Sequence, residues 1–535
     1  MTRATSRRSA VCLAAALSIV ATPLLPAAQQ ERPPFRSNTR LIEVSVVVTD
    51  REGKPAPGLT ADDFQVFDNG KPQKVELFSV ENAAAASPVP TPAPGRQREF
   101  SNEIPDVGHV TIILFDQLNS SDLARMNARE HVGRFLEQIR PDDRVGLYVL
   151  DGLGMLRVVH DFTSDASSLV KAVSSLRGNS SLAVAAEDEG ARLEAELAEL
   201  LAEERLEEAG GKAMREHYLG NRGEDTINAL ESIGRYLSGV QSRKNVIWVS
   251  SGFPLVAFDY RGRSPTREIN RATRSLNDGN VALYTVDARG LIPAFTGVPG
   301  KLVPTTLSMV QLNQDILHSV SEQTGGRAFI NTNDIQGAIR RASDDARMTY
   351  VLGYYPTDDR WDGRFHRLEV KVNRPRLEAR HRQGYFAVAT EKQASSQRSA
   401  ALNAAVSSPI NASALGMTLR IDPVEGKPSD YRLTIRVQPG AIALDPGGGE
   451  SRGAIDVIVA QVRADGAEGR SLEKRVDITV SDDRLPQFMR EGMSLDHTFT
   501  LVPSADRLRV VVRDVRTGAI GAIGVSRQHL QAIVP

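Results

Sequence analysis

Residues 108–122 read GHVTIILFDQLNSSD, and this stretch decides the fold. Its run VTIILF is apolar, which is typical of a strand buried on both faces. The run ends in Asp116, and small polar residues follow, among them Asn119 and Ser120. Oxygen atoms that follow a buried strand can cap the next helix or hold a cation. The stretch alone leaves both alternatives open.

Short apolar strands alternate with helical patterns from residue 107 to residue 347. This order predicts an α/β domain with a doubly wound, mostly parallel sheet, in which ligands bind beyond the carboxyl ends of the strands. An acidic, Ala/Leu-rich segment at about 178–222 interrupts the alternation and predicts an exposed inserted helix. Strands are expected at 110–115, 144–150, 155–162, 245–249 and 281–286, and helices at 123–140, 169–176, 226–240 and 310–324.

Two short β segments flank this domain. Residues 38–82 predict strands at 41–49, 64–67 and 74–80, and residues 348–388 predict strands at 350–355, 367–372 and 378–386. Each segment is too thin to bury its apolar face alone. We therefore predict one split β domain, with the α/β domain inserted through a Pro/Ala-rich linker at 83–106. Two independent β appendages are the alternative.

The rest of the chain predicts a second β region. Residues 389–408 are a polar Ala/Ser/Gln linker, and residues 409–535 alternate apolar and polar positions between turns. That pattern is typical of an antiparallel β-sandwich. The predicted fold is thus an α/β domain flanked by β-sandwich-like domains.

The N-terminus and the composition indicate an exported protein. Residues 1–28 have the arginines, apolar stretch and small residues of a signal peptide, by either the general or the twin-arginine route. The only cysteine, Cys12, lies in this segment, so the mature chain has no thiol chemistry. The 65 Lys and Arg residues balance 66 Asp and Glu residues, which argues against a nucleic-acid partner. No later run is long enough to span a bilayer, so we expect a periplasmic or extracellular protein.

The blocks VVVTDREGKPAPGLTADDFQVFDNG and YVLGYYPT…DGRFHRLEVKV, with the DQLNS stretch between them, resemble the acidobacterial proteins related to von Willebrand factor type A domains. The resemblance covers about residues 38–388. It implies a von Willebrand A-like sheet with a metal site built from D-x-S-x-S, a later Thr and a later Asp. Asp116, Ser120 and Thr226 match three of these five positions, with Thr226 at the head of a helix.

The other two positions of the implied metal site differ from the family pattern. Leu118 replaces the first serine, and Ser251 replaces the last aspartate. Asn119 offers an oxygen that Leu118 lacks. With one carboxylate left, Mg²⁺ or Mn²⁺ is expected to bind in the millimolar range or more weakly. Capping of the next helix by Asp116 and Ser120 is the structural alternative.

The remaining polar residues at the expected strand ends predict a binding rim. Asn119, Ser250, Ser251, Asp151 and Asp287 belong to it, although the last two are as readily explained as turn residues. The function expected is a non-enzymatic, adhesion-type protein that contacts a protein partner through this rim. A serine hydrolase and a structural envelope spacer are the alternatives. The VSSGF segment lacks the G-x-S-x-G pattern, and the histidines show no catalytic or metal-pair spacing.

Overall fold

The computed structural model describes most of the chain from residue 41 onward. The predicted signal peptide, most of the 83–106 linker and most of the acidic insertion lie outside the described residues. These residues are 41–82, 98–103, 110–176, 209–240, 242–253, 265–291, 304–358, 361–388, 395–463 and 466–533.

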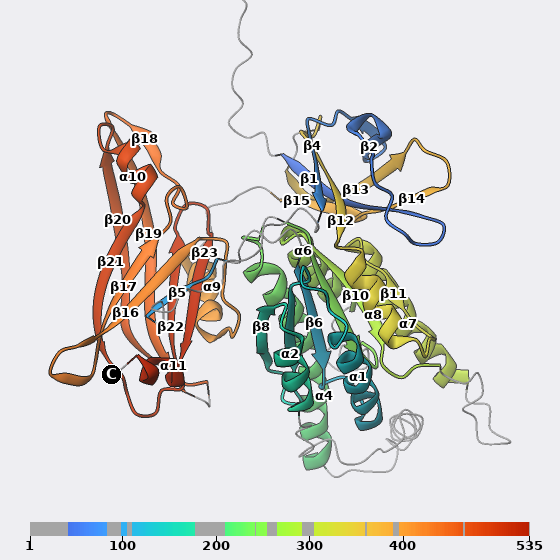
Figure 1. Cartoon of the computed structure of the whole chain (residues 1–535), viewed down its shortest axis with the longest axis horizontal. Coiled ribbons are helices and arrows are strands. Elements are labelled where there is room, and N and C mark those ends of the chain that lie inside the picture. Colours follow the sequence, from blue (N-terminus) through green and yellow to red (C-terminus); the bar gives the residue numbers. More distant parts are fainter. Residues whose placement is uncertain are drawn as a thin grey trace, which may run out of the picture. The chain divides into compact units, whose positions relative to one another are not determined.

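A six-stranded mixed sheet forms the centre of the α/β domain (Figure 1), in the order β11-β10-β9-β6-β7-β8. Neighbouring strands from β11 to β7 are parallel, whereas β8 is antiparallel to β7. The strands are β6 (Val110–Asp116), β7 (Val145–Leu150), β8 (Leu156–Thr163), β9 (Lys244–Ser250), β10 (Val281–Asp287) and β11 (Ala328–Phe329).

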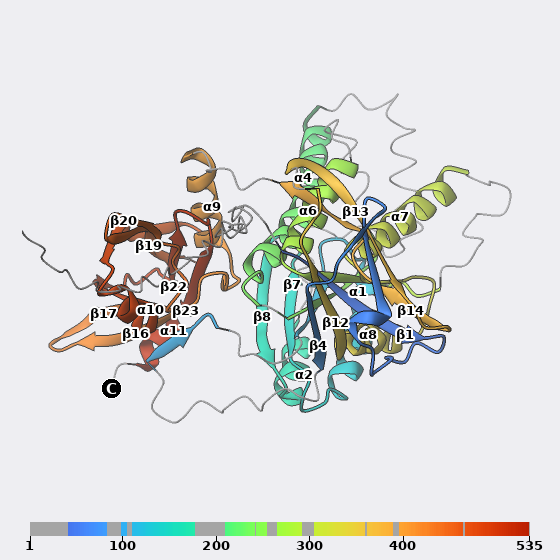
Figure 2. The same cartoon turned by 90° about the horizontal axis from the view of Figure 1, so that it is seen from above.

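Helices cover both faces of this sheet (Figure 2), and they contribute to an apolar core on each face. Alternate residues of β6 point to opposite faces: Ile112 joins one core, with residues of α4, α6 and α7, and Ile113 joins the other, with residues of α1 and α8. All seven residues of β6 are buried, as its apolar run predicts. The helices are α1 (Asp122–Leu136), α2 (Ala166–Ser174), α4 (Ala209–Tyr236), α6 (Pro265–Asp278), α7 (Pro304–Gln323) and α8 (Ile335–Asp344).

One helix prediction in this domain is wrong, and two helices were not predicted. Thr226 does not begin a helix, because α4 starts at Ala209 and places Thr226 well inside it. Four glycines between residues 210 and 223 lower the helix propensity, and packing of the later turns overrides that preference. The helices α6 and α8 were not predicted. Their polar content hides the buried side, which in α8 is formed by Ile335, Ala338, Ile339 and Ala342.

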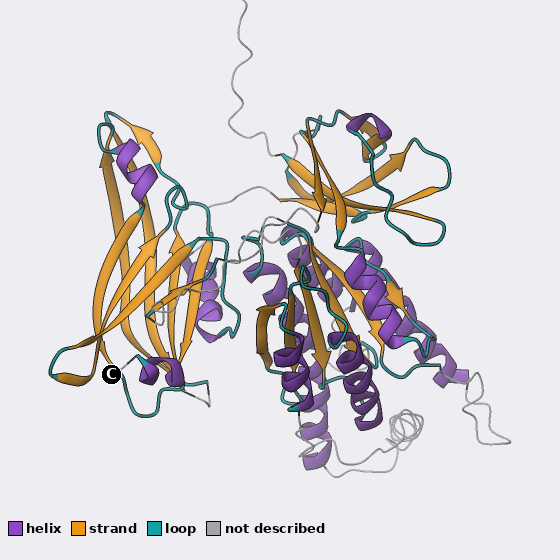
Figure 3. Ribbon diagram, in the orientation of Figure 1, coloured by secondary structure: helices purple, strands orange, loops and turns teal. Residues whose placement is uncertain are grey.

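Two further sheets enclose one core (Figure 3). Each of them combines strands from residues 42–82 with strands from residues 348–388. In one sheet β12 lies between β1 and β4, with Val44 opposite Leu352. In the other, β13 lies between β2 and β15, with Val66 opposite Val370. The strands are β1 (Ile42–Asp50), β2 (Phe64–Asp68), β3 (Lys71–Gln73), β4 (Leu77–Asn82), β12 (Met348–Tyr354), β13 (Asp362–Val372), β14 (Leu377–Arg380) and β15 (Gly384–Val388), with a short 3₁₀ helix at Ala61–Asp63.

Two strand predictions in this β domain have wrong bounds. The segment predicted at 74–80 begins after β3 (Lys71–Gln73), which pairs with β2, and only its residues from Leu77 onward belong to β4, which pairs with β12. The segment predicted at 378–386 separates into β14, which pairs with β1, and β15, which pairs with β13. In both cases the chain crosses from one sheet to the other, and this crossing interrupts strand geometry that local propensity favours.

The C-terminal region contains two antiparallel sheets around a common core. Their strand orders are β21-β17-β16-β5 and β18-β19-β22-β23, and β20 pairs with β19. The elements are β16 (Met417–Val424), β17 (Lys427–Val437), β18 (Asp445–Gly447), β19 (Glu450–Val462), β20 (Glu468–Ser481), β21 (Met493–Thr500), β22 (Arg507–Asp514), β23 (Ile520–Ser526), α10 (Leu485–Glu491) and α11 (Arg527–Ala532).

Parts of both predicted linkers are ordered elements. Within 83–106, β5 (Glu99–Ser101) pairs with β16, and Phe100 packs against the C-terminal core. Within 389–408, α9 (Ser395–Ser407) buries Leu402 and Val406. These few apolar residues are too sparse to stand out in a polar sequence, yet each finds an apolar surface. Among the described helices, none is both long enough and apolar enough to cross a membrane.

Candidate functional site

The parallel strands bring most of the predicted site residues to one edge of the central sheet. Register places Asp287 at the end of β10 opposite Ser250 at the end of β9, and Asp116 ends β6 beside Leu150 of β7. Asn119 and Ser120 follow Asp116 in the loop before α1. Thr226 reaches the same place from α4, because its side chain contacts Asn119.

Asp116 lies at the centre of a buried hydrogen-bond network. Its side chain is 1% exposed. Its Oδ1 accepts from the Asn119 backbone N–H at 2.9 Å. Its Oδ2 accepts from Asn119 Nδ2 at 2.9 Å, from Trp248 Nε1 at 2.9 Å and from Ser250 Oγ at 2.8 Å. Burial raises the pKa of Asp116, and these hydrogen bonds oppose the rise because they stabilise the carboxylate.

The Asn119 amide links Asp116 to α4. Its Nδ2 also donates to Thr226 Oγ1 at 2.8 Å, and Thr226 Oγ1 in turn donates to the Arg222 carbonyl at 2.8 Å. The Arg222 guanidinium donates to Asn119 Oδ1 at 3.4 Å. A neutral amide and a buried cation therefore occupy the space between the carboxylate and the helix.

The serines of the site are also held by neighbouring groups. Ser120 Oγ accepts from the Ser251 backbone N–H at 3.1 Å, which joins the loop after β6 to the end of β9. The Ser251 hydroxyl is buried without a hydrogen-bond partner among the described residues. The Asn313 side chain of α7 lies against Gly252, and its Oδ1 accepts from the Phe253 N–H at 2.9 Å.

The prediction that Asp116 and Ser120 cap the following helix is wrong in its details. The N-cap of α1 is Ser121, whose Oγ accepts from the Ala124 N–H at 3.3 Å. Asp116 is the last residue of β6, ahead of the cap, and it orders the intervening loop by accepting from the Asn119 backbone N–H. Leu118 is 5% exposed and belongs to the apolar core. Leu118 thus serves packing at a position where the proteins that the sequence resembles have a serine.

The residues of the implied metal site do not fit a divalent cation as arranged. Mg²⁺ requires oxygen ligands with free lone pairs in near-octahedral geometry. Asp116 Oδ2 already accepts from three donors, and Thr226 and Ser120 are engaged as well. Within the described part of the chain, no three His, Cys, Asp or Glu side chains gather where they could hold a metal ion.

Asp151 and Asp287 lie at the same edge but serve their own turns. Asp151 Oδ1 accepts from the backbone N–H groups of Leu153 and Met155, both at 3.0 Å, and thereby shapes the β7–β8 turn. Asp287 forms a two-pronged ion pair with Arg289, at 2.9 and 2.7 Å. All eight predicted site residues are at most 7% exposed. The outer surface of this edge is therefore made by other side chains.

Exposed apolar side chains stand around the buried network, and sequence reasoning missed them. Leu123 and Met126, both in the helix predicted at 123–140, are 69% and 64% exposed. A signal was present: Ala124, Ala128 and Val132 have the i, i+4 spacing of a buried stripe, which excludes positions 123 and 126. The other exposed apolar residues at this edge are Leu153, Met155 and Leu291.

Comparisons with known proteins do not identify a family. No protein-family model and no curated protein matches the sequence. The structure is similar to an aerotolerance-related membrane protein from Bacteroides fragilis NCTC 9343 (15% identity, 44% of this chain, 98% of that chain, TM-score 0.22). It is also similar to BatB from Bacteroides thetaiotaomicron (14% identity, 44% and 99%, TM-score 0.23). A third structure is the pilus adhesin SpaC from Lactobacillus rhamnosus GG (8% identity, 78% and 53%, TM-score 0.25). TM-scores this low do not establish a common fold.

Proposed function

We propose that this chain is an exported, non-enzymatic binding protein that contacts a protein partner through the carboxyl edge of a von Willebrand A-like sheet. The observation that carries the proposal is the set of exposed apolar side chains at that edge. Leu123 and Met126 follow β6, Leu153 and Met155 form the turn after β7, and Leu291 follows β10. Export rests on the N-terminal segment 1–28.

Exposed apolar residues are common when scattered, but a gathering at one edge favours a contact surface. These five are 51–69% exposed. Burying one such side chain against a partner contributes about 1.5–3 kcal/mol. Methionine at two of the five positions suits a surface that adapts to its partner. The hydrogen-bonded network beneath them keeps the loops in one arrangement, which lowers the entropy cost of binding.

We further propose that binding does not require a metal ion. A cation at Asp116, Ser120 and Thr226 has to displace hydrogen bonds that the network already contains. Any affinity for Mg²⁺ or Mn²⁺ is then millimolar or weaker, a binding free energy of roughly 4 kcal/mol or less. Recognition through apolar side chains needs no such ion.

The hydrolase alternative has no specific observation in its favour. A nucleophilic serine needs an adjacent base and a substrate-accessible hydroxyl. The Ser250 hydroxyl is buried, and its hydrogen-bond partners are the Asp116 carboxylate and the Gly252 backbone. We therefore do not propose an enzymatic activity. The spacer alternative differs from our proposal in having no partner.

The test is partner capture followed by an affinity measurement. Full-length protein is used to capture partners from an envelope extract, and the Kd of the captured protein is then measured with purified components. The variant Met126→Glu with Leu153→Glu should raise that Kd at least about 100-fold, because two apolar anchors become charged. The control Met489→Glu, at a 45% exposed methionine of α10, should leave it unchanged. If no partner is captured, or if both variants bind equally, the proposal fails.

A further inference from the structure

Two of the five exposed apolar side chains at the carboxyl edge carry sulfur. Met126 of α1 is 64% exposed, and Met155 in the turn between β7 and β8 is 51% exposed. The backbone of Met155 is held on both sides, because its N–H donates to Asp151 Oδ1 and its carbonyl accepts from the Asp151 N–H, both at 3.0 Å. The Met155 thioether therefore lies in solvent on an ordered turn.

Hydrogen bonds between neighbouring segments keep Met126 at the same edge. The Gln117 N–H after β6 donates to the Leu150 carbonyl at 2.8 Å, which joins the loop before α1 to the end of β7. Asn127, the residue after Met126, donates through Nδ2 to the Ala288 carbonyl after β10 at 2.9 Å. The two methionines thus lie on neighbouring segments at one edge of the sheet.

The other sulfur atoms of the chain offer internal references. The only cysteine, Cys12, lies in the predicted signal peptide, so methionine carries the sulfur chemistry of the mature chain. Met489 of α10 is 45% exposed and belongs to the C-terminal region, whereas Met417 of β16 is 0% exposed. Two more methionines, Met348 and Met493, are half-buried.

Solvent access decides which thioether a peroxide reaches. A lone pair of the sulfur attacks one oxygen of hydrogen peroxide, the S–O bond forms, the O–O bond breaks, and water leaves. The sulfur loses two electrons and the peroxide gains them. The product, methionine sulfoxide, is polar where the thioether was apolar. Burying such a polar group against an apolar partner surface costs free energy, whereas burying the thioether releases it.

We propose that Met126 and Met155 are modification sites whose oxidation by peroxide to the sulfoxide weakens binding of the partner protein. This inference rests on the proposed function, because it concerns the same surface. The proposed export places both thioethers in a compartment without the cytoplasmic thiol pool. Enzymes of the methionine sulfoxide reductase class reverse the step and restore the apolar surface. Binding at this edge is then controlled by the redox state of two side chains.

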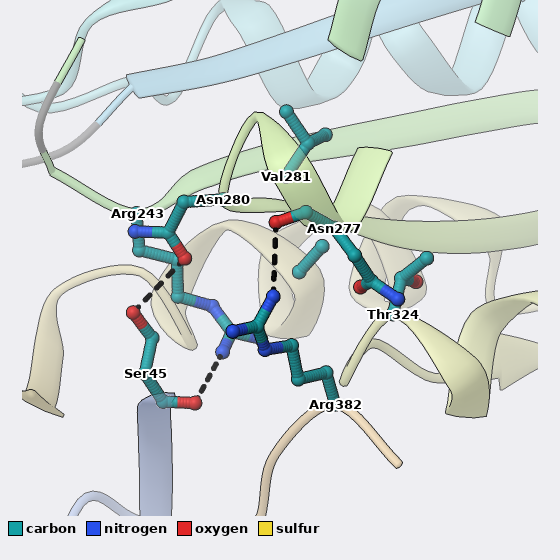
Figure 4. A pocket seen from close by; sticks show the side chains of 8 residues that line it. Ser45, Arg243, Asn277, Asn280, Val281, Thr324 and Arg382 are labelled. Carbon is teal, nitrogen blue, oxygen red and sulfur yellow. Dashed lines mark hydrogen bonds between the residues drawn. The ribbon is translucent and has the colours of Figure 1, made fainter. Parts of the chain in front are cut away.

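The amino-terminal edge of the central sheet differs in composition from the carboxyl edge. Where β1 meets β9 and β10, a cavity of about 10 Å³ is lined by residues that include no methionine (Figure 4). There the Ser45 hydroxyl donates to Asn280 Oδ1 at 3.0 Å, and Arg382 donates to the Asn277 carbonyl at 3.1 Å. Because no sulfur atom lines this joint, we expect oxidation to change the carboxyl edge and to leave the joint intact.

The first test is the site of oxidation in the full-length chain without a partner. The protein is treated with hydrogen peroxide, the peroxide is removed with catalase, and sulfoxide is located by peptide mass spectrometry. Met126, Met155 and Met489 should be oxidised while the buried Met417 is not, and Tm should change by less than about 2 °C. The proposal is overturned if Met126 or Met155 reacts no faster than Met417.

The second test is the Kd of the captured partner, itself untreated, before and after oxidation of this chain. Oxidation of the wild type should raise Kd at least about 10-fold, because two apolar contacts become polar. The double variant Met126→Leu with Met155→Leu has no thioether at the edge, so peroxide should leave its own Kd unchanged. The control Met489→Leu should show the full wild-type rise.

The outcomes separate this inference from the proposed function. If the reduced wild type binds the partner and the oxidised form binds it equally tightly, the redox control is overturned and the proposed function stands. The redox control is also overturned if the double variant loses affinity on oxidation as the wild type does. If the reduced wild type captures no partner, the proposed function fails, and the redox control fails with it.

Discussion

Replacing Asp116 by asparagine separates a structural carboxylate from a metal ligand. In an unoccupied metal site, removing a negative charge is neutral or stabilising. Here the carboxylate accepts from four buried donors, two of them from Asn119 and the others from Trp248 and Ser250. We therefore expect Asp116→Asn to destabilise the α/β domain, with or without magnesium.

The magnitude follows from the hydrogen bonds that change. The introduced asparagine keeps one acceptor oxygen, so at least one buried donor faces an NH₂ group, which costs about 1–3 kcal/mol. The remaining bonds change from charged to neutral acceptors and lose roughly 1 kcal/mol each. Loss of the buried charge, whose cost raises the pKa of Asp116, offsets part of this. The net destabilisation is about 3 kcal/mol, or about 6–12 °C in Tm for a domain of this size class.

Tryptophan fluorescence during urea unfolding is a direct assay. Trp248 donates to Asp116, and a Trp361→Phe background removes the only other tryptophan. The control is Asp315→Asn in α7, where the carboxylate is exposed; it should change stability by less than about 0.5 kcal/mol. The reasoning is refuted if Asp116→Asn is as stable as wild type. It is also refuted if millimolar Mg²⁺ stabilises the wild type strongly and the variant not at all.

Three further predictions concern other parts of the chain. Burial lowers the pKa of Lys244 to about 7, below its value in the unfolded chain. The folded protein therefore loses this proton first, and the free energy of unfolding should rise between pH 7 and pH 9. Denaturation measured across this pH range should show a flatter rise for Lys244→Met. Asp68 accepts from Tyr354, Tyr385 and His366, so Asp68→Asn should destabilise the split β domain by about 2–4 kcal/mol, and calorimetry showing no loss would contradict it. N-terminal sequencing of the native protein should find the first 27 or 28 residues removed, and an intact Met1 in cytosol would disprove export.

The sequence by itself determined the features that depend on local pattern. The apolar run of β6 is long and uninterrupted, so it predicted a buried strand, and Asp116 at its end predicted which edge of the sheet carries the polar residues. Alternation with helical patterns placed β7, β9 and β10 to within a residue or so. Asn69-Gly70 is a local hairpin signal of the same kind, because Asn69 adopts a positive φ between β2 and β3.

The tertiary structure alone decided what these polar residues do. No local pattern shows that the Asn119 amide lies between Asp116 and Thr226, because Thr226 arrives from a helix more than a hundred residues later. Nor does helical spacing alone tell whether Met126 faces the core or the solvent, since this depends on which side of α1 meets the sheet. The pairing of β4 with β12, which follows the crossing from β3, and the pairing of β5 with β16 likewise depend on hydrogen bonds between segments far apart in the sequence. Local propensity specifies a strand, but only its partners determine which sheet it joins.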